Sequence, residues 1–178
     1  MPFTPRQFPI RLSRRVGLRH MQSIGAKRLV CPSGEQIVNG GFENAWTGWE
    51  HGIDAYITNA YKRSGTWSLG LTAYSEPENF AWVKQTLTNP IPVACVDEFK
   101  LYCHADWYPS TEKKLLVTIG YTDASTTQVT VSFYETYVWH EKDLKPYLSA
   151  GKTIKYVRIE SLAFADINVD DVTLTGKG

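Results

Sequence analysis

Between residues 80 and 174, short segments of alternating apolar and polar residues follow one another, and turn residues separate them. A period of two places successive side chains on opposite faces, so each segment predicts a half-buried strand. No strong helical period interrupts the series, although residues 141–150 leave room for one helical turn. Many short strands at this spacing predict an all-β sandwich or barrel. The predicted strands cover residues 80–87, 99–107, 115–121, 127–135, 155–161 and 167–174.

The apolar side of each predicted strand supplies the expected core, because a strand in such a fold buries one of its two faces. The opposite side carries larger polar and aromatic residues, which are therefore candidates for binding. The expected core residues are Ala81, Val83, Gln85, Leu87, Phe99, Leu101, Cys103, Ala105, Leu115, Val117, Ile119, Tyr121, Val129, Val131, Phe133, Val157 and Ile159.

The chain has 178 residues, which is enough for one domain with a sizeable core. No apolar run approaches the roughly 18 residues that a membrane span requires. We expect no secretion signal at the N-terminus, because arginines interrupt any apolar stretch there.

The three cysteines, Cys31, Cys95 and Cys103, do not have the spacing of a metal site. An odd number excludes a framework in which every cysteine is paired, and we expect reduced thiols. A Cys95–Cys103 bridge stays open as an alternative.

The net charge of +1 hides an uneven distribution. Residues 1–34 hold seven of the 19 basic residues and none of the 18 acidic ones, so the remainder has 12 bases, 18 acids and a net charge of −6. This change of composition predicts a basic arm over residues 1–34 and a sandwich domain over residues 35–178.

The arm combines arginines with apolar side chains, and three partners are open. Dense positive charge suits a phosphate backbone, the arm can lie on an acidic membrane surface, or it can cross a neighbouring acidic subunit. We favour the neighbouring subunit, contacted through residues 1–30; nucleic acid is less expected, and no membrane partner is expected. The arm residues assigned to assembly are Phe3, Arg6, Phe8, Ile10, Arg11, Arg14, Arg15 and Arg19.

An ordered set of motifs carries a family resemblance over about residues 36–174. The motifs are Val38-Asn-Gly-Gly-Phe-Glu43, Thr47-Gly-Trp49, Ser64-Gly-Thr-Trp-Ser-Leu69, Gln85-Thr-Leu87, Trp139 and Val169-Asp-Asp-Val-Thr-Leu174. The set resembles the carbohydrate-binding modules of the galactose-binding-like jelly-roll fold, which occur attached to xylanases and other glycanases. The resemblance implies two packed antiparallel sheets, no catalytic activity, and buried positions for Trp49, Trp67 and Trp139.

The same resemblance often implies one structural calcium ion near the chain ends. Glu43 matches one ligand position, and Asp170 or its neighbour Asp171 matches another. Calcium takes six to eight oxygen ligands, and backbone carbonyls of the turn around Ser64 could complete its shell. The alternative is that Glu43 is a surface acid and that Asp170 caps a strand end.

Sugar binding uses flat aromatic rings, on which pyranose rings stack, together with polar side chains. Outward-facing aromatic and polar residues of two predicted strands, with nearby tryptophans, are therefore the candidates, provided that the two strands lie close together. The alternative for Trp82 and Tyr102 is packing against the arm or a neighbouring subunit. The carbohydrate-binding candidates are Trp82, Lys84, Tyr102, His104, Asp106, Trp46 and Trp107.

The sequence contains none of the common catalytic motifs, and the acids Glu76 and Glu78 lie in a segment that favours solvated charge. We therefore expect no enzyme. The leading expectation is a structural or adhesion protein: a carbohydrate-binding-module-like sandwich displayed on a virion, as a decoration or tail component, or on another extracellular assembly surface, and anchored by its arm. The alternative is a stand-alone soluble module that recognises a polysaccharide.

Overall fold

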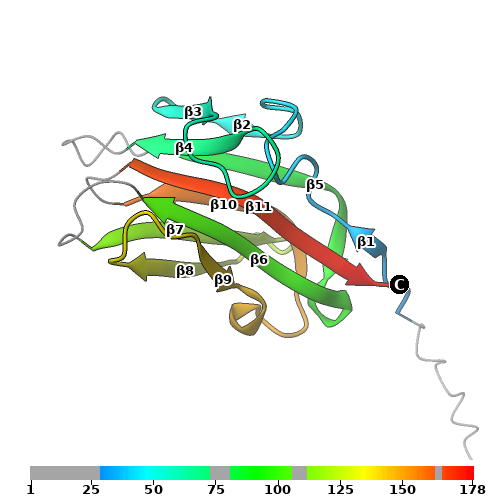
Figure 1. Ribbon diagram of the computed structural model, residues 1–178. Coiled ribbons are helices and arrows are strands. Elements are labelled where there is room, and N and C mark those ends of the chain that lie inside the picture. Colours follow the sequence, from blue (N-terminus) through cyan, green and yellow to red (C-terminus); the bar gives the residue numbers. More distant parts are fainter. Residues whose placement is uncertain (1–28, 73–80, 106–111, 163–165) are drawn as a thin grey trace, which may run out of the picture.

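The computed structural model describes residues 29–72, 81–105, 112–162 and 166–178, which form two packed antiparallel sheets (Figure 1). The predicted all-β fold is confirmed, and the expected helical turn is the short 3-10 helix η2 (Lys145–Tyr147). The strands are β1 (Ser33–Glu35), β2 (Glu50–His51), β3 (Ala55–Thr58), β4 (Ser68–Thr72), β5 (Trp82–Pro92), β6 (Val96–Ala105), β7 (Lys113–Tyr121), β8 (Thr126–Phe133), β9 (His140–Asp143), β10 (Thr153–Ser161) and β11 (Asp166–Lys177).

The first sheet has the order β3-β4-β11-β6-β9, and β1 pairs with the end of β11. The second sheet has the order β2-β5-β10-β7-β8. The chain crosses between the sheets after β5, through the 3-10 helix η1 (Val93–Cys95), so β5 and β6 belong to different sheets. The six-stranded and five-stranded sheets therefore turn their outer faces in opposite directions.

The core lies between the sheets, and the alternation in the sequence predicted its members. All the expected core residues are buried, including Gln85, whose side chain exchanges hydrogen bonds with the backbone of Val38. Because the side-chain period of a strand is two, the same registers turn Trp82, Lys84 and Tyr102 outward.

The cysteine prediction was wrong, because Cys31 and Cys95 form a disulfide with a Cα–Cα distance of 5.2 Å. Gly176 of β11 pairs with Gly34 on one side and with Val96 on the other, which brings the two cysteines together. Cys103 is a buried free thiol. Sequence spacing could not reveal a bridge across 64 residues.

The three family tryptophans have different surroundings. Trp49 is buried as predicted, packs on Phe42 and donates its indole N–H to the carbonyl of Asn39. The prediction was wrong for Trp67, which is 37% exposed because it precedes the buried strand β4 and lies beside a surface hollow. Trp139 is half-buried on the outer side of the six-stranded sheet, against His104, rather than in the core.

Among the described residues, no helix has the length and apolar character needed to cross a membrane.

Candidate functional site

The predicted carbohydrate-binding residues do not form one patch. Trp82 and Lys84 lie on β5 in the five-stranded sheet, whereas Tyr102 and His104 lie on β6 in the six-stranded sheet. The condition that the two strands lie side by side is therefore not met, because the chain changes sheets between them. Asp106, Trp107 and the eight arm residues lie outside the described residues.

The outer face of the five-stranded sheet carries two aromatic rings, each of which lies over a glycine. One glycine directly follows β2, and the other lies on β7. The indole of Trp82 covers Gly52, where an added Cβ would come within 2.3 Å of its Nε1. The ring of Tyr156, on β10, covers Gly120 of β7 in the same way, with an added Cβ 1.9 Å from its Cε1. Glycine at these two positions therefore allows both rings to lie against the sheet.

A row of charged side chains crosses the face between the two rings. Glu50, Lys84 and Arg158 are direct neighbours on β2, β5 and β10, and Thr118 of β7 follows Arg158 in the same row. The Nζ atom of Lys84 lies 3.5 Å from a carboxylate oxygen of Glu50 and 5.3 Å from the ring centre of Tyr156. The ammonium group of Lys84 thus lies near the ring on one side of the row, at the outer limit of a cation–π contact.

Arg158 connects this row to Trp82. Its guanidinium lies over the Trp82 ring, 4.4 Å from the ring centre, and donates a hydrogen bond of 2.7 Å to Glu160. The ion pair fixes the guanidinium, and the guanidinium in turn orients the indole. The face therefore presents two positioned aromatic rings with hydrogen-bond donors and acceptors between them.

Three residues of this face, Tyr156, Arg158 and Glu160, were not predicted from the sequence. They are the outward positions of the predicted strand 155–161, of which only the inward Val157 and Ile159 were used. Three large polar or aromatic residues at alternate positions were the available signal. Their importance could not be recognised, because the pairing of β10 with β5 was unknown.

Trp46 lies at the edge beyond β2. Its ring is half-buried and stacks on the ring of His51 at 4.0 Å between centres. Trp46 also packs against the core, so it borders the five-stranded face without forming an open platform.

On the six-stranded sheet, Tyr102 is covered by charged neighbours. The guanidinium of Arg63 lies 3.5 Å from the centre of its ring, and its hydroxyl donates a hydrogen bond to Glu141. That hydrogen bond raises the pKa of Tyr102 above its usual value. One face of the ring is therefore occupied by a side chain of the same molecule.

His104 faces the outer side of the same sheet as predicted, but it is buried beneath other rings. Tyr61 stacks on it at 5.0 Å, Trp139 lies at 5.2 Å, and Tyr137 lies edge-on at 6.5 Å. Only 4% of the residue is exposed. His104 thus lies at the centre of an aromatic cluster, and its role in sugar binding stays a prediction.

The predicted calcium ligands gather around the loop of residues 61–67. Glu43 accepts the backbone N–H groups of Thr66 and Trp67, at 2.9 and 3.0 Å. Asp170 is buried and accepts the N–H groups of Arg63 and Ser64, at 2.8 and 3.2 Å. Burial raises the pKa of Asp170 to about 6, although these hydrogen bonds oppose the increase.

Asp171 binds the guanidinium of Arg63 and the hydroxyl of Ser64. The loop thus offers N–H groups and a cation to the carboxylates, whereas calcium needs converging oxygen atoms. Among the described residues, no group of three or more His, Cys, Asp or Glu side chains is arranged to hold a metal ion. This donor set does not fit calcium, and the calcium expected from the resemblance stays a prediction.

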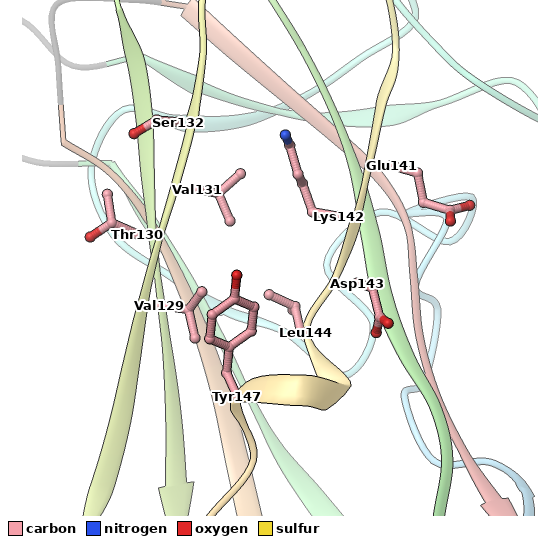
Figure 2. A pocket seen from close by; sticks show the side chains of 9 residues that line it. All are labelled: Val129, Thr130, Val131, Ser132, Glu141, Lys142, Asp143, Leu144 and Tyr147. Atoms are coloured by element: carbon pink, nitrogen blue, oxygen red, sulfur yellow. The ribbon is translucent and has the colours of Figure 1, made fainter.

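A groove of about 460 Å³ opens between β8 and β9, the edge strands of the two sheets (Figure 2). Val129, Val131 and Leu144 line its inner side, and Lys142 and Tyr147 extend along it. None of the described residues predicted from the sequence to bind sugar or metal lines this groove. Its lining combines three aliphatic side chains and the single ring of Tyr147 with polar and charged residues: Thr130, Ser132, Glu141, Lys142 and Asp143.

No protein-family model matches the sequence, and no curated protein matches it. Solved structures do match. A family 16 carbohydrate-binding module is 20% identical over 79% of this chain and 99% of its own, with a TM-score of 0.55. TmCBM61, solved with β-1,4-galactotriose, is 14% identical over 82% of this chain and 100% of its own, with a TM-score of 0.55.

A third similar structure contains the CBM22-1 and GH10 modules of a Clostridium thermocellum endo-1,4-β-D-xylanase, complexed with xylohexaose. It is 18% identical over 81% of this chain and 29% of its own, with a TM-score of 0.59. At such identities the likeness concerns the fold alone. The chain therefore has the jelly-roll β-sandwich fold of carbohydrate-binding modules, as the resemblance in its sequence implied.

Proposed function

We propose that the protein is a non-catalytic carbohydrate-binding module that binds a polysaccharide chain on the outer face of its five-stranded sheet. The observation that carries the proposal is the placement of Trp82 and Tyr156 against Gly52 and Gly120, on either side of the row that contains Lys84 and Arg158. Flat rings accept the apolar faces of sugars, and the charged row can bind their hydroxyl groups.

The spacing of the rings favours an extended ligand. Trp82 is paired with Glu160, and Tyr156 is four residues away from Glu160 along the same strand. Four residues correspond to about 13 Å of strand. A ligand that contacts both rings therefore has to span several sugar units, so we propose a polysaccharide segment rather than a single sugar.

Titration calorimetry with soluble polysaccharides and oligosaccharides, including xylohexaose and β-1,4-galactotriose, tests this proposal. Trp82→Ala and Tyr156→Ala each should weaken binding about 10-fold or more, because each removes a platform in the centre of the site. Tyr137→Ala, which removes a ring that is 67% exposed beside β6 of the other sheet, is the matched control and should leave binding unchanged. Equal affinity of Trp82→Ala and the parent chain would refute the proposal.

The proposed absence of catalysis agrees with the ion pairs on this face. Glu50 lies in the row and is paired with Lys84. Glu160 lies beside the row and is paired with Arg158. A glycoside hydrolase of the usual kind needs one protonated acid and one free carboxylate beside the scissile bond. Release of reducing ends from a bound polysaccharide would contradict this part of the proposal.

Display on an assembly, anchored by residues 1–30, belongs to the same proposal. The sandwich begins beside the C-terminus, where β1 pairs with β11 (Figure 1). The Cys31–Cys95 disulfide fixes the chain at this position. Disulfides are typical of oxidising environments, which supports an extracellular or virion surface as the location.

Light scattering on the full chain and on a chain that starts at Val30 tests the anchoring. We expect large species for the full chain and a monomer for the shorter one, with equal glycan affinity per site. Monomers in both cases would leave the stand-alone module as the function.

A further inference from the structure

Trp67 borders a hollow of about 470 Å³ at the β3 edge of the six-stranded sheet. The hollow is lined by Glu43, Asn44, Ala45, Ile57 and Trp67. Its volume is in the range of small-molecule sites, and such sites combine an apolar wall with a few polar groups. Trp67 was expected to be buried, so its exposure beside a hollow needs a separate explanation.

The loop on one side of the hollow is held in a fixed shape. The side chain of Asn39 donates to the carbonyl of Ala45 at 2.8 Å and accepts the N–H of Asn44 at 2.9 Å. Asn39, Phe42 and Ala45 have φ angles of 55°, 58° and 49°, in the left-handed region. Three such residues within seven positions are costly, and backbone strain of this kind gathers at binding sites.

The wall that carries Trp67 is held from the same loop. Glu43 accepts the backbone N–H of Trp67 at 3.0 Å and that of Thr66 at 2.9 Å. Gly65, with a φ of 59°, permits this approach, because an added Cβ would lie 2.2 Å from Oε1 of Glu43. Both sides of the hollow are therefore positioned before any ligand arrives, which reduces the entropic cost of binding.

We propose that this hollow is a second carbohydrate subsite, in which a sugar ring packs against the indole of Trp67 and bonds to the side chain of Asn44. Ile57 extends the apolar wall, and Glu43, whose carboxylate holds the backbone of Thr66 and Trp67, lies at the rim. A sugar ring has apolar C–H faces and polar hydroxyl edges, which matches an indole beside a carboxamide better than a purely apolar ligand does. The ligand class rests on the function proposed above.

The hollow lies apart from the row that contains Lys84 and Arg158, since β3 and β5 belong to different sheets. One chain therefore has two sugar sites of different size. The five-stranded face suits an extended segment, and the hollow suits one or two rings, such as a chain end or a side branch. Two linked sites on one module raise the apparent affinity for a long polysaccharide above that for a short oligosaccharide.

The test is a nuclear magnetic resonance titration of the full chain, labelled with nitrogen-15, with xylohexaose and with β-1,4-galactotriose. The chain has six tryptophan indole N–H signals, and Trp67→Phe and Trp82→Phe assign two of them by their disappearance. We expect both signals to shift with at least one of the sugars. Trp67→Ala should weaken sugar binding in the hollow 10-fold or more and leave the shift of the Trp82 signal unchanged. Trp82→Ala should leave the shift of the Trp67 signal unchanged.

The outcomes separate the two proposals. A Trp82 shift without a Trp67 shift overturns the second subsite and keeps the five-stranded face, and the reverse result keeps the hollow and overturns the face. Loss of the Trp67 shift in Trp82→Ala also overturns the second subsite, because the shift is then transmitted. Absence of both shifts overturns both proposals.

Two further variants guard against an effect of folding. Asn44→Ala changes an exposed side chain and should weaken the same site severalfold without a change in melting temperature. Trp67→Phe keeps a flat ring and should retain part of the affinity. Trp67→Ala could instead change the oligomeric state in light scattering and leave the sugar titration unchanged. That result would make the hollow a contact between copies of the chain and would refute the subsite.

Discussion

The outer faces of the two sheets contain similar residues but use them differently. On the five-stranded sheet, Trp82 and Tyr156 lie against glycines and stay apart, and the guanidinium of Arg158 lies over Trp82. On the six-stranded sheet, Tyr61 and Trp139 pack on His104, and Arg63 covers Tyr102. The cross-strand neighbours of an outward aromatic residue thus decide whether its ring lies singly against the sheet or joins a cluster.

The largest effect that separates the faces is expected for the centre of the aromatic cluster. His104→Ala should lower the free energy of unfolding by about 2 kcal/mol, since it removes a buried ring from beneath Tyr61 and Trp139. Chemical denaturation measures this, and calorimetry should show unchanged affinity for glycan. A loss of affinity without a loss of stability would assign ligand binding to the six-stranded face and reverse the comparison.

A matched pair of glycine variants sharpens the comparison. Gly120→Ala displaces the ring of Tyr156, because the added Cβ would lie 1.9 Å from that ring, and should reduce glycan affinity severalfold. Gly70→Ala on the six-stranded sheet displaces the ring of Tyr56, where the added Cβ would lie 2.3 Å away, and should leave affinity unchanged. Equal losses in both variants would mean that the effect is general strain and not the loss of a platform.

On the six-stranded sheet, a pH dependence of stability between pH 4 and pH 6 is expected from Asp170. The pKa of Asp170 is about 6 in the folded protein against a usual value of 3.8. The folded state therefore binds more protons between these values, so the stabilisation from Asp170 is full below pH 4 and is lost as the pH rises through 6.

Thermal melts of the parent chain and of Asp170→Asn between pH 4 and pH 7 measure this contribution. The advantage of the parent chain should shrink as the pH rises. Binding on the five-stranded face should not follow the same curve. An advantage that grows with pH would show that the hydrogen bonds from Arg63 and Ser64 outweigh the burial of the carboxylate.

The smallest effect is expected for metal removal. Because backbone N–H groups and Arg63 occupy the carboxylates of Glu43, Asp170 and Asp171, EDTA should leave the melting temperature unchanged. The melting temperature is also measured after calcium chloride is added. A rise in melting temperature of several degrees with calcium would confirm the ion predicted from the family resemblance and would mean that the carboxylates turn to coordinate it.

The alternation in the sequence was sufficient to predict which side chains point into the core between the sheets. Val83, Leu101 and Ile159 are in the core and Trp82 and Tyr102 face outward, because the period of two is a local property of the extended backbone. The motif order was sufficient for the fold class as well. The same alternation predicted that Trp82 on β5 and Tyr102 on β6 face outward.

Only the tertiary structure decided which of these outward residues meet. The crossing after β5 separates Trp82 from Tyr102, and the pairing of β10 with β5 brings Arg158 to Trp82 instead. The Cys31–Cys95 bridge also depends on contacts between segments that are distant in the chain. The exposed position of Trp67 beside Asn44 depends on the shape of a loop. Local periodicity records the direction of a side chain relative to its own strand, whereas the neighbour of that strand is chosen by the packing of the whole sandwich.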